Sequence, residues 1–128
     1  INDRSNLQKV VAATTLLGIQ HVLEEALRGR VHDWKWEKQS GRNKRVLKGA
    51  LGALDQLMNE HALEAEDVVY HIHRLLTAGR LLLEETMLCE LLEALADCDV
   101  KLQKSMHGRV QLEEFLHRVK EISQNQNS

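Results

Sequence analysis

Proline is absent from the 128 residues of this chain, and the aromatic residues are limited to Trp34, Trp36, Tyr70 and Phe115. Without proline, no residue interrupts a helix by removing a backbone donor. The chain also has few runs of β-branched residues, which argues against a β-sandwich rich in turns. With so few aromatic side chains, the core has to be built mainly from leucine, valine and alanine. These absences predict helix throughout.

Cysteine is scarce, and no apolar run reaches the length of about 18 residues that a membrane span needs. Cys89 and Cys98 lie on one expected helix, on opposite faces and about 13 Å apart along its axis. A disulfide needs Cα atoms within about 7 Å of each other, so we expect free thiols and a reducing compartment. Because no signal-peptide pattern is present either, the expected location is intracellular, in the cytoplasm or nucleus.

The composition is that of a folded domain. Hydrophobic residues are 43% of the chain and charged residues 28%, with a formal net charge of −2, which is unlike a disordered protein. At this length one domain can bury a sizeable core. We therefore expect a single domain over 1–128, with a frayed polar tail at 123–128. Since the first residue is Ile1 rather than methionine, we expect a processed protein or a domain cut from a longer one.

The clearest pattern runs from Glu64 to Cys98 and predicts two amphipathic helices joined at 77–80. The apolar residues on one face of the first helix are Ala65, Val68, Val69, Ile72, Leu75 and Leu76, and those of the second are Leu88, Leu91, Leu92 and Leu95. Between them, Gly79 supplies a stop, because glycine accepts the left-handed conformation that closes many helices. Two helices with so short a connection pack antiparallel and need further helices to cover them.

A first helix is expected from Ser5 or Asn6, either of which can cap it, to about Arg28. It is apolar nearly all round. One stripe consists of Leu7, Val10, Val11, Thr14, Leu17, Gly18 and Val22, and the other of Ala12, Leu16, Ile19, Leu23 and Leu27. Such a helix is normally buried on all sides, so we expect it in the middle of the bundle. The alternative is an edge position with self-association through the second stripe.

Further helices are expected at about 43–58, 99–106 and 109–122. On one side of the 43–58 helix lie Gly49 and Gly52, although each glycine costs a helix about 1 kcal/mol relative to alanine. They indicate either a close approach by another segment or an exposed face that is poorly optimised. Together with the helical pair, these segments predict an all-α fold, a single compact bundle of five or six helices.

The segment 28–48 is strongly basic, with eight Lys or Arg against Asp33 and Glu37. Ser40 and Gly41 indicate a turn, and the piece at 32–39 is expected as a short helix or an ordered loop. The candidate partner-binding residues are Trp34, Trp36, Lys38, Arg42, Lys44, Arg45 and Lys48. Basic side chains between aromatic ones suit single-stranded nucleic acid and equally a protein interface. In a third interpretation, the tryptophans fill one end of the bundle.

No motif indicates catalysis. A glycine-rich phosphate loop, a nucleophile elbow and a paired-cysteine zinc spacing are all missing. His71 and His73 are about 200° apart on a helix, and the Glu114-x-x-His117 pattern of di-iron bundles has no second copy. We therefore expect no catalytic, cofactor or metal site. The predicted function is a non-enzymatic helical protein–protein interaction module, an adaptor, scaffold or regulatory domain without membrane contact; the alternative is a nucleic-acid-binding domain using 28–48.

Overall fold

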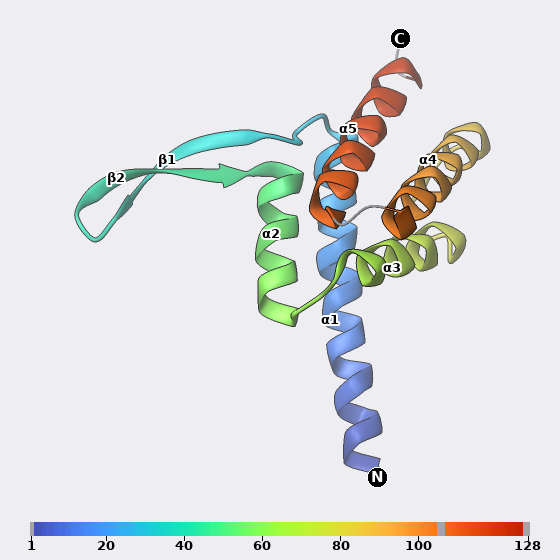
Figure 1. Cartoon of the computed structure of the whole chain (residues 1–128), viewed down its shortest axis with the longest axis horizontal. Coiled ribbons are helices and arrows are strands. Elements are labelled where there is room, and N and C mark those ends of the chain that lie inside the picture. Colours follow the sequence, from blue (N-terminus) through green and yellow to red (C-terminus); the bar gives the residue numbers. More distant parts are fainter. Residues whose placement is uncertain (1, 105–106, 127–128) are drawn as a thin grey trace.

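The structure, a computed structural model, describes residues 2–104 and 107–126, and for residues 2–12 the backbone alone. Within these residues the chain forms five helices and one two-stranded sheet. The elements are α1 (Asn2–Leu27), β1 (Asp33–Gln39), β2 (Arg42–Lys48), α2 (Gly49–His61), α3 (Ala65–Thr77), α4 (Glu85–Lys104) and α5 (Gly108–Gln126). The helices gather into one body, and the two strands reach away from it (Figure 1). A mostly helical fold is thus confirmed.

The prediction of a purely all-α bundle is not confirmed, because residues 33–48 form an antiparallel hairpin. Its register runs from Asp33 opposite Lys48 to Gln39 opposite Arg42. The loop consists of Ser40 and Gly41, whose φ angles of 53° and 79° are both positive. Such two-residue loops match the right-handed twist of a strand pair. The expected helix or loop at 32–39 and the expected helical start at 43–48 are therefore wrong.

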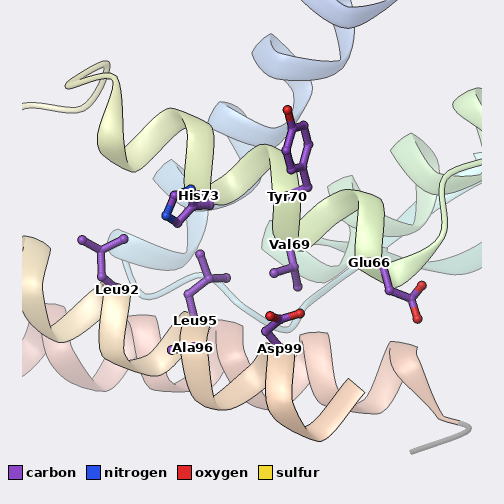
Figure 2. A pocket seen from close by; sticks show the side chains of 8 residues that line it. All are labelled: Glu66, Val69, Tyr70, His73, Leu92, Leu95, Ala96 and Asp99. Atoms are coloured by element: carbon purple, nitrogen blue, oxygen red, sulfur yellow. The ribbon is translucent and has the colours of Figure 1, made fainter. Parts of the chain in front are cut away.

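The paired helices at the centre of the sequence agree best with expectation. All six residues of the predicted α3 stripe are buried, and α3 and α4 face each other (Figure 2). At the start of α3, Glu64 and Asp67 form a reciprocal capping box, in which the Glu64 backbone N–H donates to Asp67 Oδ2 at 3.0 Å. The predicted stop is at Gly79, whose φ is +68°. The connection is longer than expected, since α4 begins only at Glu85.

The ends of α4 and α5 depart from expectation. Helix α4 continues through Asp99 to Lys104, so no separate helix begins at 99; residues 105–106 lie outside the described part. Helix α5 continues to Gln126, and within it Ser123 is buried, with its Oγ donating to the Leu27 carbonyl oxygen at 2.7 Å. The frayed tail predicted from 123 is wrong for 123–126, because this hydrogen bond ties the end of α5 to the end of α1. Residues 127–128 are outside the described range.

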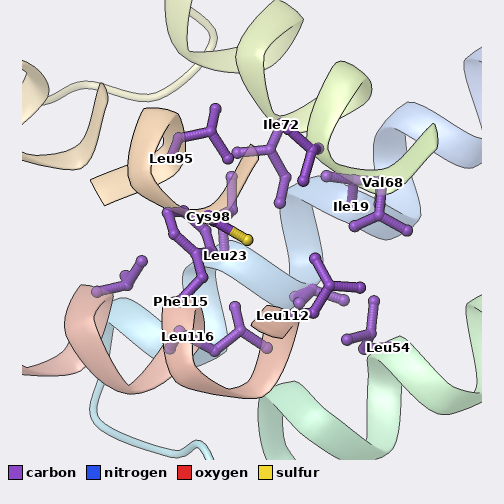
Figure 3. Packing of buried hydrophobic residues seen from close by; sticks show 14 of the residues in the cluster. Ile19, Leu23, Leu54, Val68, Ile72, Leu95, Cys98, Leu112, Phe115 and Leu116 are labelled. Carbon is purple, nitrogen blue, oxygen red and sulfur yellow. The ribbon is translucent and has the colours of Figure 1, made fainter. Parts of the chain in front are cut away.

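Helix α1 supplies one wall of the core and packs against α2, α3 and α5. Its buried apolar residues, each at most 1% exposed, are Ile19, Val22, Leu23 and Ala26. They meet the largest buried side chains of the other helices, among them Leu54, Ile72, Leu112 and Phe115 (Figure 3). The expected coverage all round fails at Leu17, which is 64% exposed. The expected stripe residues at 7–12 have no described side chains.

The base of the hairpin is attached to the first turn of α2. The backbone N–H groups of Ala50 and Leu51 donate to the carbonyls of Arg30 and Val31 at 2.7 and 3.1 Å, which satisfies donors that a helix start leaves open. A Cβ atom on Gly52 would lie 2.2 Å from the Leu47 carbonyl oxygen. Of the two explanations for the glycines, close approach is therefore right: β2 lies against Gly52, and the connection before β1 lies against Gly49. None of the described helices is long and apolar enough to cross a membrane.

Candidate functional site

The two tryptophans of the hairpin lie on one face of it and are open to solvent. Trp34 is 50% exposed and Trp36 is 69% exposed, and as alternate residues of β1 they point to the same side. The guanidinium carbon of Arg45 lies 4.7 Å from the centre of a Trp34 ring, within the range of a cation–π contact. The interpretation in which the tryptophans fill one end of the bundle is therefore wrong.

The seven candidate residues are brought together on the hairpin but divide between its two faces. Residues directly opposite in an antiparallel pair share a face, and Trp36 stands opposite Arg45. One face accordingly presents Trp34, Trp36, Lys38 and Arg45, and is called here the tryptophan face. The other presents Arg42, Lys44 and Lys48, together with Glu37. Sequence spacing alone did not separate these two sets, because the strand register was not predicted.

The positive charge is least compensated at the tip of the hairpin. Near its base, Lys48 Nζ is 2.8 Å from Glu37 Oε1. Toward the loop, Lys38, Arg42 and Lys44 are exposed and form no ion pair with a carboxylate of the described residues. Exposed cations of this kind interact favourably with an acidic surface or with phosphates. The hairpin can therefore offer aromatic contact and positive charge to the same partner.

A second surface, which the sequence did not reveal, is a groove of about 430 Å³ between α3 and α4. It is lined by Glu66, Val69, Tyr70, His73, Leu92, Leu95, Ala96 and Asp99 (Figure 2). The two carboxylates lie toward one end, and the aliphatic side chains form the floor. Tyr70 is 60% exposed. In the sequence, the two helices show acidic residues beside their apolar stripes. How the two helices lie against each other depends on the tertiary fold, so the sequence alone does not predict the groove.

The two histidines of α3 occupy different environments. His73 lines the groove, whereas the His71 ring lies 5.5 Å from that of Tyr70 and its Nδ1 is buried without a hydrogen-bond partner among the described residues. Burial lowers the pKa of His71, the Arg74 guanidinium lowers it further, and Asp67 acts in the opposite direction. This environment therefore disfavours the charged form of the His71 imidazole. In the Glu114-x-x-His117 pattern, Glu114 Oε1 lies 2.7 Å from Lys101 Nζ.

Both cysteines are free thiols. Cys89 is exposed and Cys98 is buried, with its Sγ 3.6 Å from the Gln111 carbonyl oxygen. Burial, followed by the negative charges of Asp99 and Glu114, raises the pKa of the Cys98 thiol to about 11. A thiol that keeps its proton is a poor nucleophile and a poor metal ligand. Cys98 thus belongs to the packing of α4 against α5.

The comparisons with known proteins add one finding. A family model described as the replication factor C C-terminal domain matches residues 42–118, which is more than half of the chain. The matched range begins at β2, contains α2, α3 and α4, and ends within α5. Helix α1 and strand β1 precede it, so the hairpin lies across its boundary. No curated protein and no solved structure matches.

Proposed function

Because this chain belongs to the replication factor C C-terminal domain family, we propose that it is a non-enzymatic module that binds other subunits of a clamp loader. Replication factor C is an AAA+ clamp loader subunit, and the family's domain is its helical C-terminal part. A domain of this kind acts as a scaffold by holding neighbouring subunits together. The role would place the protein in the nucleus or the cytoplasm.

The tryptophan face is the observation that carries this proposal. Tryptophan and arginine are the residues that most often anchor protein interfaces, and here Arg45 is already stacked on Trp34. Such pre-arranged side chains lose little freedom on binding. Trp34 and Trp36 contribute nothing to the core, so their exposure on a projecting hairpin is best explained by a partner that covers them.

The groove between α3 and α4 supplies a second, oppositely charged surface. In Figure 1, α3 and α4, whose side chains line the groove, lie on the other side of the helical body from the hairpin. Glu66 and Asp99 at its rim complement the charge of Lys38 and Arg42. We propose that it receives a basic segment of the subunit on that side. Contacts made through two different surfaces are heterologous, and they close a ring when the rotation between subunits allows it.

Nucleic acid is the second candidate partner, because the same hairpin suits it. Aromatic rings that stack on bases, with cations beside them for the phosphates, are the usual means of binding single strands. The exposed cations at the tip, Lys38, Arg42 and Lys44, which pair with no carboxylate in the described part of the chain, favour this alternative. Since the chain as a whole has a pI of about 6.4, binding would be local to the hairpin.

The test is binding of the chain to the remaining clamp-loader subunits of the same cell, measured by titration after nuclease treatment. We expect the double variant Trp34→Ala/Trp36→Ala to weaken binding more than about tenfold, as loss of anchor residues does. Lys35→Ala, on the other face of β1, is the matched control. For the groove, Asp99→Lys should weaken binding, whereas Glu93→Lys, an exposed α4 position outside the groove, should not.

The same proteins distinguish the alternative. Should the wild type bind a fluorescein-labelled single-stranded oligonucleotide, with salt dependence and with loss in the tryptophan variant, nucleic acid would be the partner. Subunit binding that persists after nuclease treatment and is equally strong in the tryptophan variant would contradict the role of the hairpin. Circular dichroism of each variant shows whether the helical body is intact.

A further inference from the structure

Three side chains able to ligate a metal ion meet where the connection before β1 passes α5. His32 lies in that connection, while Glu113 and His117 are four residues apart on α5 and so share a face of it. One ligating atom of each lies within 4.8 Å of those of the other two. His32 Nε2 is 3.1 Å from Glu113 Oε1, and the imidazole rings of His32 and His117 are 5.0 Å apart between centroids.

We propose that His32, Glu113 and His117 form a binding site for a divalent ion of the zinc type. Two imidazoles and one carboxylate are a set that zinc proteins use, with water in the fourth position. Bonds of about 2.0–2.2 Å place the ligand atoms of a tetrahedron about 3.4 Å apart. His32 Nε2 and Glu113 Oε1, at 3.1 Å, are already that close, and the remaining pairs of ligand atoms, all within 4.8 Å, need to approach by at most about 1.4 Å. Imidazole nitrogen favours Zn²⁺ and its neighbours over Mg²⁺ and Ca²⁺, which prefer oxygen.

The carboxylate of this site is oriented by a chain of charged groups behind it. Arg109 Nη1 is 3.4 Å from Glu113 Oε2, and Arg109 Nε donates to Asp55 Oδ1 on α2 at 2.6 Å. One oxygen of Glu113 is therefore held by Arg109, while the other, Oε1, faces His32. Metal sites commonly have outer partners of this kind, which fix the ligand atoms in place. As an ion pair alone, His32 and Glu113 would contribute little, because both side chains are more than a third exposed.

An ion at this point would fix the base of the hairpin. His32 directly precedes β1 and follows Arg30 and Val31, whose carbonyls accept hydrogen bonds from the start of α2. A bond from His32 to α5 would add a second attachment on the other side of the hairpin base. The ion would thus join residues that are far apart in the sequence and limit the directions in which the tryptophan face points. This inference does not depend on which partner the hairpin binds.

The site escaped sequence analysis because the local pattern paired His117 with the wrong acid. Glu114, three residues before His117, forms an ion pair with Lys101 on α4. The acid that faces the same way as His117 is Glu113, and the third ligand comes from the loop before β1. Only the fold brings these three together.

The experiment uses the full chain, treated with a chelator, in a Cys89→Ser background so that the exposed thiol binds no ion. We expect one Zn²⁺ per chain by calorimetry, a visible absorption band of four-coordinate Co²⁺, and a higher unfolding temperature with Zn²⁺. His32→Ala and His117→Ala should each weaken binding by at least about tenfold, on the scale of losses at metal sites. Glu113→Gln, which keeps the shape of the side chain, should weaken it as well.

The matched control is His73→Ala, which removes an exposed histidine on α3 and should leave binding unchanged. Equal Zn²⁺ affinity in the wild type, His32→Ala and His117→Ala would overturn the proposal, as would the absence of a one-to-one complex. His32 lies in an exposed connection, so its variant tests the site even if His117→Ala reduces the stability of α5. Binding lost only in His73→Ala would place the ion elsewhere and equally contradict the assignment.

Discussion

Helix α3 buries six apolar residues, whereas neither strand of the hairpin has a single fully buried one. The two regions nevertheless belong to one continuous fold, since the chain passes from β2 directly into α2. Because burial of apolar area is the main source of stability, the helical body should determine whether the domain folds. The hairpin, attached at its base alone, should contribute to binding and little to folding. This separation of stability from binding can be tested by substitution.

The largest expected effect on stability is at α1, where substitutions on the buried face and on the exposed face should differ. Leu23 is 1% exposed, so Leu23→Glu places an unpaired charge in the core and should unfold the domain. Leu17 is 64% exposed, and Leu17→Glu should change the free energy of unfolding by less than about 0.5 kcal/mol. Urea unfolding followed by circular dichroism measures both.

The same pair of variants tests self-association through α1. If Leu23→Glu remained folded and light scattering showed a dimer changed to a monomer, the helix would lie at an edge that a second copy covers. Leu16, half-buried on the same stripe, gives an intermediate case: Leu16→Glu should destabilise the domain less than Leu23→Glu. An equal loss at Leu17 and Leu23 would contradict the packing of α1 described above.

A smaller loss is expected in the paired helices α3 and α4. Ile72 and Leu91 are each 1% exposed, and Ile72→Ala or Leu91→Ala should reduce the free energy of unfolding by about 2–5 kcal/mol, as large-to-small changes in a core do. The control is Tyr70→Ala, at an exposed position of the same helix. Losses below about 1 kcal/mol would show that the stripes are not buried. Subunit binding, measured under conditions where the variants are folded, should be unaffected by either core change.

The difference between α3 and the hairpin also explains what the sequence can reveal. In α3 the apolar residues recur with the helical period, and a capping box and Gly79 mark its limits, so local pattern and burial agree. Along the hairpin, the strand signal was the alternation of Trp34 and Trp36 with charged residues. Without a buried face to support it, that alternation was outweighed by the expectation of helix.

The candidate sites were predictable to different degrees for the same reason. The candidate binding residues of the hairpin could be named from composition, because tryptophan beside lysine and arginine is a local feature. The groove of Glu66 and Asp99 depends on how α3 lies against α4, and the cluster at His32 depends on how a loop meets α5. Sites formed by packing between segments that are distant in the sequence produce no characteristic residue spacing, so they cannot be predicted from sequence patterns.

Gly52 tests the junction between the two regions, with an effect of intermediate size. In an exposed helix, glycine to alanine stabilises by about 1 kcal/mol. Here the added Cβ would meet the Leu47 carbonyl oxygen at 2.2 Å, so Gly52→Ala should instead destabilise by about 1–3 kcal/mol, as overpacking does. Urea unfolding gives the sign, and tryptophan fluorescence reports whether the hairpin has moved. A stabilised Gly52→Ala protein would mean that β2 does not lie against α2.

The smallest effect concerns the two thiols, one outside and one inside the helical body. Since the pKa of Cys98 is raised from 9.0 to about 11, its thiolate fraction near pH 8 should be about a hundredfold below that of an ordinary thiol. In a Cys89→Ala protein, a thiol reagent should therefore label Cys98 slowly until denaturant is added. In a Cys98→Ala protein, the exposed Cys89 should be labelled at once. Rapid labelling of Cys98 in the folded protein would contradict its burial.

The raised pKa of Cys98 also predicts a dependence of stability on alkaline pH. Above about pH 9 the unfolded chain releases the Cys98 proton while the folded chain retains it, so the free energy of unfolding should fall as the pH rises from about 9 to about 11. Below that range both states hold the proton, and this thiol adds no slope. The Cys98→Ala protein should lack that part of the decline, whereas Cys89→Ala should keep it. Identical pH profiles for the two variants would show that the buried Cys98 thiol titrates like the exposed Cys89 thiol. They would contradict the difference in environment between the two thiols of α4.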